Sequence, residues 1–307
     1  MKICFMGSMK FAVPILEGLN KKYEIVMVVT QPDKPVGRKG ILTGTAVKIR
    51  ALELGLPIFQ PVNIKNDYKP IMDLNLDYII VAAYGQMIPE IVLSHPKTRA
   101  INVHASLLPK YRGGSPMHRA IQYGDSETGI TVMYMAMKMD AGDILSQKSI
   151  PILKSDNVGT LEAKLGIVGN ELLLDTLENI NQIVPRKQDI NLVTFARNIK
   201  PEEERIYFQQ NAESINNHVR GFYPWPLTYC IIDKLKLKLY NITFVDEDLS
   251  SKPGEIVKID KQGVYVQTTK GLIILKDVQL QGKKRMKIND FMNGAGKTLL
   301  KLGDRFE

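Results

Sequence analysis

Two short runs near the start of the chain decide the fold: "KICFMG" at residues 2–7 and "YEIVMVVTQ" at residues 23–31. Both are almost continuously apolar, so we expect two buried strands. Between them, "KFAVPILEGLNK" at residues 10–21 places apolar residues at helical spacing and ends near Gly18 and Asn20. A strand, a helix and a strand in this order predict parallel strands joined by a crossover helix.

The same alternation continues through the first half of the chain. "TAVKIRALELG" predicts a helix closed by Gly55, while "LDYIIVAAYG" and "RAINVHAS" predict two further buried strands. This alternation of strands and helices indicates an α/β fold with a parallel sheet that is covered on both faces. In such sheets, ligands bind beyond the carboxyl ends of the strands.

The second half of the chain does not continue the regular alternation of strands and helices. After the strand "GITVMYM" and the long helix "TLEAKLGIVGNELLLDTLENI", Pro185, Pro201 and the acidic run 202–204 interrupt any periodicity, which indicates a linker. Next, "RIYFQQNAESINNHVRGF" predicts a helix. Five short strand-like runs with turn residues between them then predict a small antiparallel barrel. Two domains fit a chain of 307 residues.

The composition is that of an ordinary globular protein, with 44% hydrophobic and 24% charged residues. Apolar runs such as residues 78–85 are shorter than the roughly 20 residues of a membrane span, and no secretory signal is visible. Cys4 and Cys230 are the only cysteines, so we expect a cytoplasmic setting without disulfides. No histidine is paired at ligand spacing with a cysteine or a second histidine, so no metal is expected. A net charge of +9 favours polyanions, although a lysine-rich composition alone explains it equally well.

Candidate catalytic residues gather in "INVHASLLPKYRGGSP", residues 101–116. Asn102 and His104 lie two apart in an extended segment, so their side chains point to the same side. An amide beside an imidazole can hold a carbonyl oxygen that becomes negative, although two polar residues could also simply cap the following turn. In "DAGD", Asp140 or Asp143 could orient the imidazole, or could merely bond its own turn backbone.

Taken together, these segments resemble the formyltransferase family that uses 10-formyltetrahydrofolate. The resemblance covers nearly the whole chain, through "CFMGSMKFAVPILEGL", "VVTQPDKPVGR", "AAYGQMIP", "NVHASLLPKYRG", "MDAGDIL", "VRGFYPWP" and "LQGKKRM". It implies that Asn102, His104 and Asp140 are catalytic and that Asp143 is structural. It also implies a Rossmann-like formyltransferase domain with a mainly parallel sheet (1–189), a linker (190–205) and an OB-like β-barrel domain that contacts tRNA (206–307).

The resemblance implies transfer of the formyl group of 10-formyltetrahydrofolate to the α-amino group of methionyl-tRNA. A free α-amino group titrates near ~8, so the amine needs little activation. The harder tasks are alignment of the amine with the formyl carbon and stabilisation of the oxyanion. A cis Leu108–Pro109 bond is expected. The expected folate contacts are Ser106, Leu107, Leu108, Pro109, Gln86, Met87 and Ile88.

A basic loop at residues 31–50 could bind phosphates of the acceptor arm of initiator tRNA, or could be only a solvated loop. It departs from the family pattern, because Lys34 stands where arginine is common and no Ser-Pro precedes "VK". Residues 201–307 carry 17 Lys and Arg against 14 Asp and Glu, so local patches must contact RNA there. We expect Trp225, between two prolines, to pack in the domain core. The expected tRNA contacts are Lys34, Arg38, Lys39, Lys48, Lys283, Lys284 and Arg285.

Several alternatives remain. A formyltransferase acting on an amino-sugar nucleotide would have the same layout and the same three catalytic residues, but "QPDKPVGR" and "KKRM" favour tRNA. A glycinamide ribonucleotide formyltransferase resembles only the first domain. A dinucleotide-dependent oxidoreductase is disfavoured, since "GSMKFA" lacks G-x-G-x-x-G. A non-catalytic RNA-binding module explains the charge and the barrel but not Asn102, His104 and Asp140. No obligate protein partner is evident.

Overall fold

A computed structural model describes residues 1–37 and 40–307. It divides into two compact units, each discontinuous in sequence. The first unit is Met1–Pro116, Glu127–Pro151 and Leu161–Arg197; the second is Met117–Ser126, Ile152–Thr160 and Asn198–Glu307. The second unit thus takes two short segments from within the first 189 residues, and the three predicted domain ranges stay a prediction.

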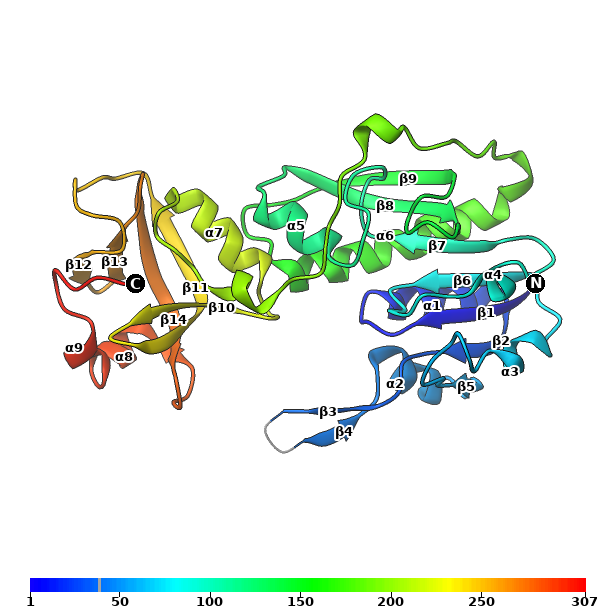
Figure 1. The fold of residues 1–307 in the computed structure, drawn as a ribbon, viewed down its shortest axis with the longest axis horizontal. Helices are drawn as coiled ribbons and strands as arrows, with labels where there is room; N and C mark the ends of the chain where they lie inside the picture. Colours follow the sequence, from blue (N-terminus) through cyan, green and yellow to red (C-terminus); the bar gives the residue numbers. More distant parts are fainter. Residues whose placement is uncertain (38–39) are drawn as a thin grey trace. The chain divides into compact units, whose positions relative to one another are not determined.

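Figure 1 shows the elements in chain order. The strands of the first unit are β1 (Lys2–Gly7), β2 (Glu24–Val29), β3 (Lys34–Val36), β4 (Ile41–Thr43), β5 (Ile58–Phe59), β6 (Tyr78–Ala82), β7 (Ala100–His104), β8 (Glu127–Tyr134) and β9 (Ile144–Pro151). Its helices are α1 (Ala12–Lys22), α2 (Ala46–Glu53), α3 (Lys69–Met72), α4 (Glu90–Leu93) and most of α6 (Val158–Glu178), with 3-10 turns at Ile180–Gln182 and Ile190–Leu192. The helix α5 (Pro116–Gln122) belongs to the second unit from Met117 onward.

The main sheet of the first unit has seven strands in the order β5-β2-β1-β6-β7-β8-β9. The five strands from β5 to β7 are parallel, and β8 and β9 complete the sheet antiparallel. The predicted mainly parallel sheet is therefore confirmed. Its first βαβ unit is the predicted strand, helix and strand.

The continuous apolar character of β1 has a simple cause, since both of its faces are covered. Cys4 and Met6 belong to a buried cluster with Ile71 of α3 and Val92 of α4. Ile3 and Phe5 alternate with them and are equally buried. A strand buried on both sides cannot tolerate the alternation of polar residues seen in half-exposed strands.

The second unit contains α7 (Ala212–Gly221), the strands β10 (Thr228–Ile232), β11 (Leu235–Val245), β12 (Ile256–Asp260), β13 (Gly263–Gln267), β14 (Leu272–Leu280) and β15 (Met286–Lys287), the helices α8 (Ile288–Met292) and α9 (Gly296–Leu299), and a 3-10 turn at Pro201–Glu204. Its antiparallel sheet has the order β10-β11-β14-β13-β12, with β15 paired to β14. In β11, Leu237 and Leu239 are buried and Lys236 and Lys238 are exposed, so the "LKLKL" run places one face on the core.

The segment that ends the described chain covers both edges of this sheet. The Ile256 N–H of β12 donates to Asp304 O (2.8 Å), and the Glu307 N–H donates to Ile231 O of β10 (2.9 Å). The predicted α/β domain with an antiparallel β domain is confirmed. The strand pairings of the described residues form an open path, and the terminal segment bonds both edge strands of it.

The predicted helix beginning at Arg205 is wrong in its first part. The Ile206 N–H donates to Tyr229 O (2.8 Å), and Arg205 forms a parallel bridge with Tyr229, so residues 205–206 pair with the edge of β10. The helix begins only at Ala212, where Asn211 accepts a hydrogen bond from the Ser214 N–H (2.8 Å) as an N-cap. None of the helices in the described ranges has the length and apolar character needed to cross a membrane.

Candidate active site

The carboxyl end of β7 presents Asn102 and His104 on one face, as the spacing predicts. They pair with Met133 and Thr131 of β8, which fixes their register. Both side chains are almost completely buried. Two polar groups placed this way at the edge of a parallel sheet lie where such sheets bind ligands.

Asp140 reaches His104 from a loop 36 residues further on. Asp140 Oδ1 lies 3.7 Å from His104 Nδ1, and Oδ2 accepts the Gly113 N–H at 2.8 Å. His104 Nε2 is 3.0 Å from Tyr111 O; because a carbonyl only accepts, Nε2 carries a proton. The predicted juxtaposition of His104 with Asp140, rather than with Asp143, is the geometry that the structure contains.

The backbone around these groups is unusual. Asp140 has a φ of 48° and Tyr111 a φ of 61°, a region that non-glycine residues seldom occupy. At Gly142 a Cβ would overlap Tyr134 O, and at Gly113, with a φ of 123°, a Cβ would come within 2.6 Å of Ala196 O. Such strain persists only where the surroundings enforce it, and it is frequent at functional sites.

The floor of the site is a hydrogen-bonded network around Thr131. Its hydroxyl donates to Ser106 O (2.7 Å) and accepts the Leu108 N–H (3.0 Å), and Gln147 Nε2 donates to both Leu108 O (2.8 Å) and Thr131 Oγ1 (2.9 Å). The Leu108–Pro109 bond is cis, as expected. These bonds tie the loop after β7 to β8 and β9.

Sequence reasoning missed a clamp on the Asp140 loop. Gln188 Nε2 donates to Asp140 O (2.9 Å) and Gly142 O (2.8 Å), while Gln188 Oε1 accepts from Arg112 Nε (3.0 Å) and Nη2 (2.7 Å). Arg112 is only 5% exposed. No local pattern signals this clamp, because Gln188 falls in an aperiodic stretch just before the predicted linker (190–205).

The residues expected to contact folate lie on two neighbouring loops. One follows β6 and the other follows β7, and these strands pair in parallel. Gln86 is engaged within the protein, since its Oε1 accepts the Ile64 N–H (2.8 Å) and its Nε2 donates to Pro61 O (3.2 Å). Met87 is 48% exposed. Ser106, Leu108 and Ile88 are buried, and Leu107 and Pro109 are partly buried.

The basic residues expected to contact tRNA come from both units. Lys34 is exposed on β3, whereas Lys48 Nζ bonds Asp33 at 2.6 and 2.8 Å. Gln60 and Lys48 together hold the pKa of the Asp33 carboxyl below its usual range. In the second unit Lys283, Lys284 and Arg285 are exposed. Arg38 and Lys39 lie outside the described residues.

Trp225 does not pack in the domain core. Its side chain is 63% exposed, and both the Tyr223–Pro224 and Trp225–Pro226 bonds are cis. Its carbonyl lies 3.3 Å from Nε2 of His118, whose pKa is lowered to about 4 by burial. Within residues 1–37 and 40–307, no group of three or more His, Cys, Asp or Glu side chains is placed to hold a metal ion.

The formyl transferase family model matches residues 1–177, and the formyl transferase C-terminal domain matches residues 198–296. The methionyl-tRNA formyltransferase of Listeria innocua is 46% identical over 305 residues, covering 98% of this chain and 97% of that protein. That of Staphylococcus epidermidis is 45% identical over 306 residues, covering 97% and 98%.

Solved structures show the same fold at lower identity. WlaRD, a sugar 3N-formyl transferase, superposes with a TM-score of 0.68 at 20% identity, covering 92% of this chain and 99% of its own. HypX from Aquifex aeolicus, in complex with tetrahydrofolic acid, superposes at 0.63 and 18% identity, covering 100% of this chain and 50% of its own. With both domains matched in order and the relatives aligned almost end to end, the chain belongs to the formyl transferase family.

Proposed function

We propose that this protein transfers the formyl group of 10-formyltetrahydrofolate to the α-amino group of methionyl-tRNA. The observation that carries the proposal is that the buried Asn102 and His104 lie at the carboxyl edge of the parallel sheet, with the partly buried Asp140 facing His104. Relatives named methionyl-tRNA formyltransferase, 44–46% identical over nearly the whole chain, support the acceptor.

Asn102 and His104 stabilise the charge that develops on the formyl oxygen. Both can donate a hydrogen bond from a nearly desolvated position, where a donor is worth more than in water. The Nε2–H of His104 already faces Tyr111 O, so the formyl oxygen would share or replace this acceptor. Asn102, on the same face of β7, supplies a second donor.

Asp140 handles the proton of the attacking amine. Its Oδ2 is held by the Gly113 N–H, and its Oδ1 faces His104 Nδ1 at 3.7 Å. The carboxylate can thus take the proton of the attacking amine through water and relay it to the folate nitrogen, which leaves as its bond to the formyl carbon breaks. Because the α-amino group is already partly deprotonated at neutral pH, alignment of the reactants is the larger requirement.

The loops after β6 and β7 fit the folate that supplies the formyl group. Both leave the same edge of the sheet, beside Asn102, and Met87 exposes an apolar side chain there. Heterocyclic ligands occupy sites with apolar walls and a few directed polar groups. Because the Gln86 amide already bonds the 61–64 segment, we expect a folate contact at Gln86 to come from its backbone.

The finer features of the acceptor are also proposals. We expect preference for initiator tRNA, contact of Lys34 and the β3–β4 hairpin with the acceptor arm, and action in the cytoplasm, where translation begins. Lys48 is already paired with Asp33, which supports a role in positioning this segment. Exposed Lys34 has its charge available for a phosphate.

The test is formyl transfer by the purified protein from 10-formyltetrahydrofolate to methionyl-tRNA, with an amino-sugar nucleotide as the competing acceptor. The proposal requires formylmethionyl-tRNA to form at least a hundredfold faster than the formylated sugar. Preference for the sugar would make the chain an amino-sugar-nucleotide formyltransferase. Binding of tRNA without any formyl transfer would leave only an RNA-binding module.

A further inference from the structure

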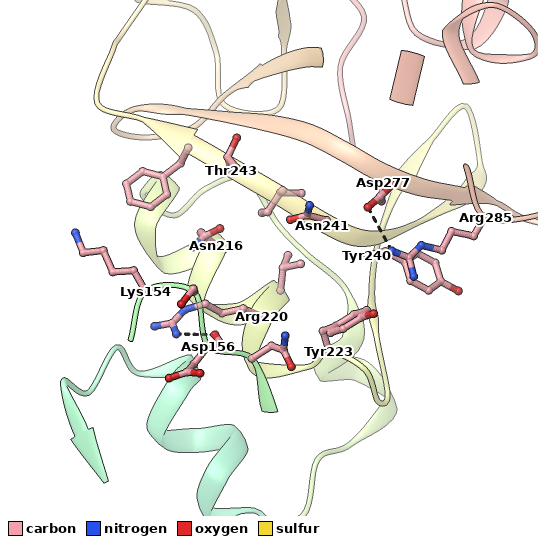
Figure 2. Close-up of a pocket in the computed structure, with 15 residues that line it drawn as sticks. Lys154, Asp156, Asn216, Arg220, Tyr223, Tyr240, Asn241, Thr243, Asp277 and Arg285 are labelled. Atoms are coloured by element: carbon pink, nitrogen blue, oxygen red, sulfur yellow. Dashed lines mark hydrogen bonds and ion pairs between the residues drawn. The ribbon is translucent and has the colours of Figure 1, made fainter. Parts of the chain in front are cut away.

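The second unit contains a cavity of about 540 Å³ that the proposed chemistry does not use. Figure 2 shows side chains from α7, β11 and β14 and from the 154–157 segment around it. The groups that matter are two tyrosines, three cations and an exposed hydroxyl: Tyr223, Tyr240, Lys154, Arg220, Arg285 and Thr243. The volume lies within the about 300–1,000 Å³ typical of sites for small organic groups.

The planar guanidinium of Arg285 is held in place at the wall of this cavity. Its Cζ lies 4.5 Å from the ring centre of Tyr240, and its Nη2 donates to Asp277 Oδ2 at 3.3 Å. Tyr240 is itself fixed, because its hydroxyl donates to Gln279 (2.7 Å). The Arg285 Cζ also lies 6.0 Å from the ring centre of Tyr223, and the Arg285 side chain remains 44% exposed. A planar cation that is fixed beside aromatic rings and remains accessible can stack a nucleobase.

The acidic groups of the cavity are already satisfied. Asp277 is 4% exposed and lies within 3.3 Å of both Arg285 and Lys287. The Asp156 carboxylate accepts the Leu153 N–H (2.9 Å) and the Thr160 hydroxyl (2.9 Å). The open wall of the cavity is therefore dominated by positive charge, which favours an anionic ligand.

A second cation is fixed on the opposite wall. Arg220 Nη1 donates to Leu153 O (3.2 Å) and Asp156 O (3.0 Å), and Arg220 Nε donates to Asn217 Oδ1 (2.9 Å). Lys154 is exposed beside it. A charge held in place loses little conformational entropy when it binds a phosphate.

We propose that this cavity accepts one unstacked nucleotide of an RNA strand, with the base on Arg285 and the phosphate on Lys154 and Arg220. This inference rests on the proposed function and identifies a contact of the second domain with its RNA substrate. Continuity with the neighbouring basic turn favours a strand over a free nucleotide. Gln279 Nε2 donates to Lys283 O (2.8 Å), which joins the turn of Lys283 and Lys284 to Tyr240.

The experiment measures equilibrium binding of uncharged tRNA to the full-length protein by fluorescence anisotropy, over a range of salt concentrations. Arg285→Lys is the decisive variant, because it keeps the charge beside Asp277 but removes the stacking plane. We expect its affinity to fall by about 5- to 150-fold, as for loss of one stacked base, with little change in salt dependence. Lys154→Ala should instead lower the slope of log K against log salt by about 0.7 to 0.9.

Lys301→Ala is the matched control, since this exposed lysine of the second unit does not line the cavity. Wild-type affinity in both Arg285→Lys and Lys154→Ala, with thermal unfolding unchanged, would overturn the inference. Ultraviolet cross-linking is an independent test of base binding, because a base bound in the cavity should cross-link to a peptide that contains Tyr223 or Tyr240. If wild-type protein formylates methionyl-tRNA while these variants bind normally, the cavity inference alone fails; if no formyl is transferred, the proposed function fails.

Discussion

Gln188 is the residue whose replacement tests the architecture of the site most sharply. Gln188→Leu removes two donors to the Asp140 and Gly142 carbonyls and the acceptor of the buried Arg112 guanidinium. At about 1 kcal/mol for each of the two neutral bonds and about 2 kcal/mol for the two Arg112 bonds counted as one shared contact, the free energy of unfolding falls by about 4 kcal/mol. For a unit of this size, that is a loss of about 8–16 °C in the midpoint of thermal unfolding.

Turnover should fall as well, because the freed loop carries Asp140. A displacement of about 1 Å in a reacting group can reduce the rate about a hundredfold. Gln188→Glu separates the two effects: it keeps an acceptor for Arg112, but it places a carboxylate against two carbonyl oxygens. We expect Gln188→Glu to retain more stability than Gln188→Leu but to show a similarly reduced kcat for formyl transfer.

Thr176→Val is the control for general destabilisation. Thr176 is buried on α6, and its hydroxyl bonds Ser146 of β9 at 2.6 Å. Calorimetry should show a lowered midpoint for this variant, and a formylation assay should show normal kcat below that midpoint. The reasoning is refuted if both Gln188 variants turn over at the wild-type rate, or if Thr176→Val loses turnover to the same extent.

Four further predictions address the site and the fold. His104→Ala should lower kcat by about 10²–10³ and Asp140→Asn by about 10²–10⁴, each with a wild-type unfolding midpoint; an unchanged kcat would remove either residue from the mechanism. Gly142→Ala should destabilise the first unit in urea unfolding, since its Cβ meets Tyr134 O. Burial lowers the pKa of His118 to about 4, so its neutral form is favoured on folding. Stability is then complete above about pH 6.5 and declines by about 3 kcal/mol as the pH falls through 4; His118→Gln should flatten this profile, and an equally steep profile would contradict the assignment. Lys34→Ala should weaken tRNA binding and reduce its salt dependence by about one ion, and identical salt titrations would exclude a phosphate contact.

Local patterns in the sequence determined much of this protein. Because side chains alternate along a strand, the two-residue spacing alone placed Asn102 and His104 on one face of β7. The apolar runs predicted the strands of the parallel sheet, and the short strand-like runs predicted the antiparallel strands of the second unit. Local patterns gave wrong predictions at two positions. At Ile206, pairing with β10 replaced the predicted helix, and at Trp225, the position between two prolines indicated burial but the side chain is exposed.

Tertiary structure alone decided which distant groups meet. Asp140, in the loop between β8 and β9, approaches His104 of β7, and Gln188 bonds Asp140 across 48 residues of chain. The position of the Arg285 guanidinium likewise depends on its contact with Tyr240 of β11. Propensity and periodicity report on neighbours within a few residues, whereas these contacts depend on strand register and chain crossing, which are selected by the packing of the whole core.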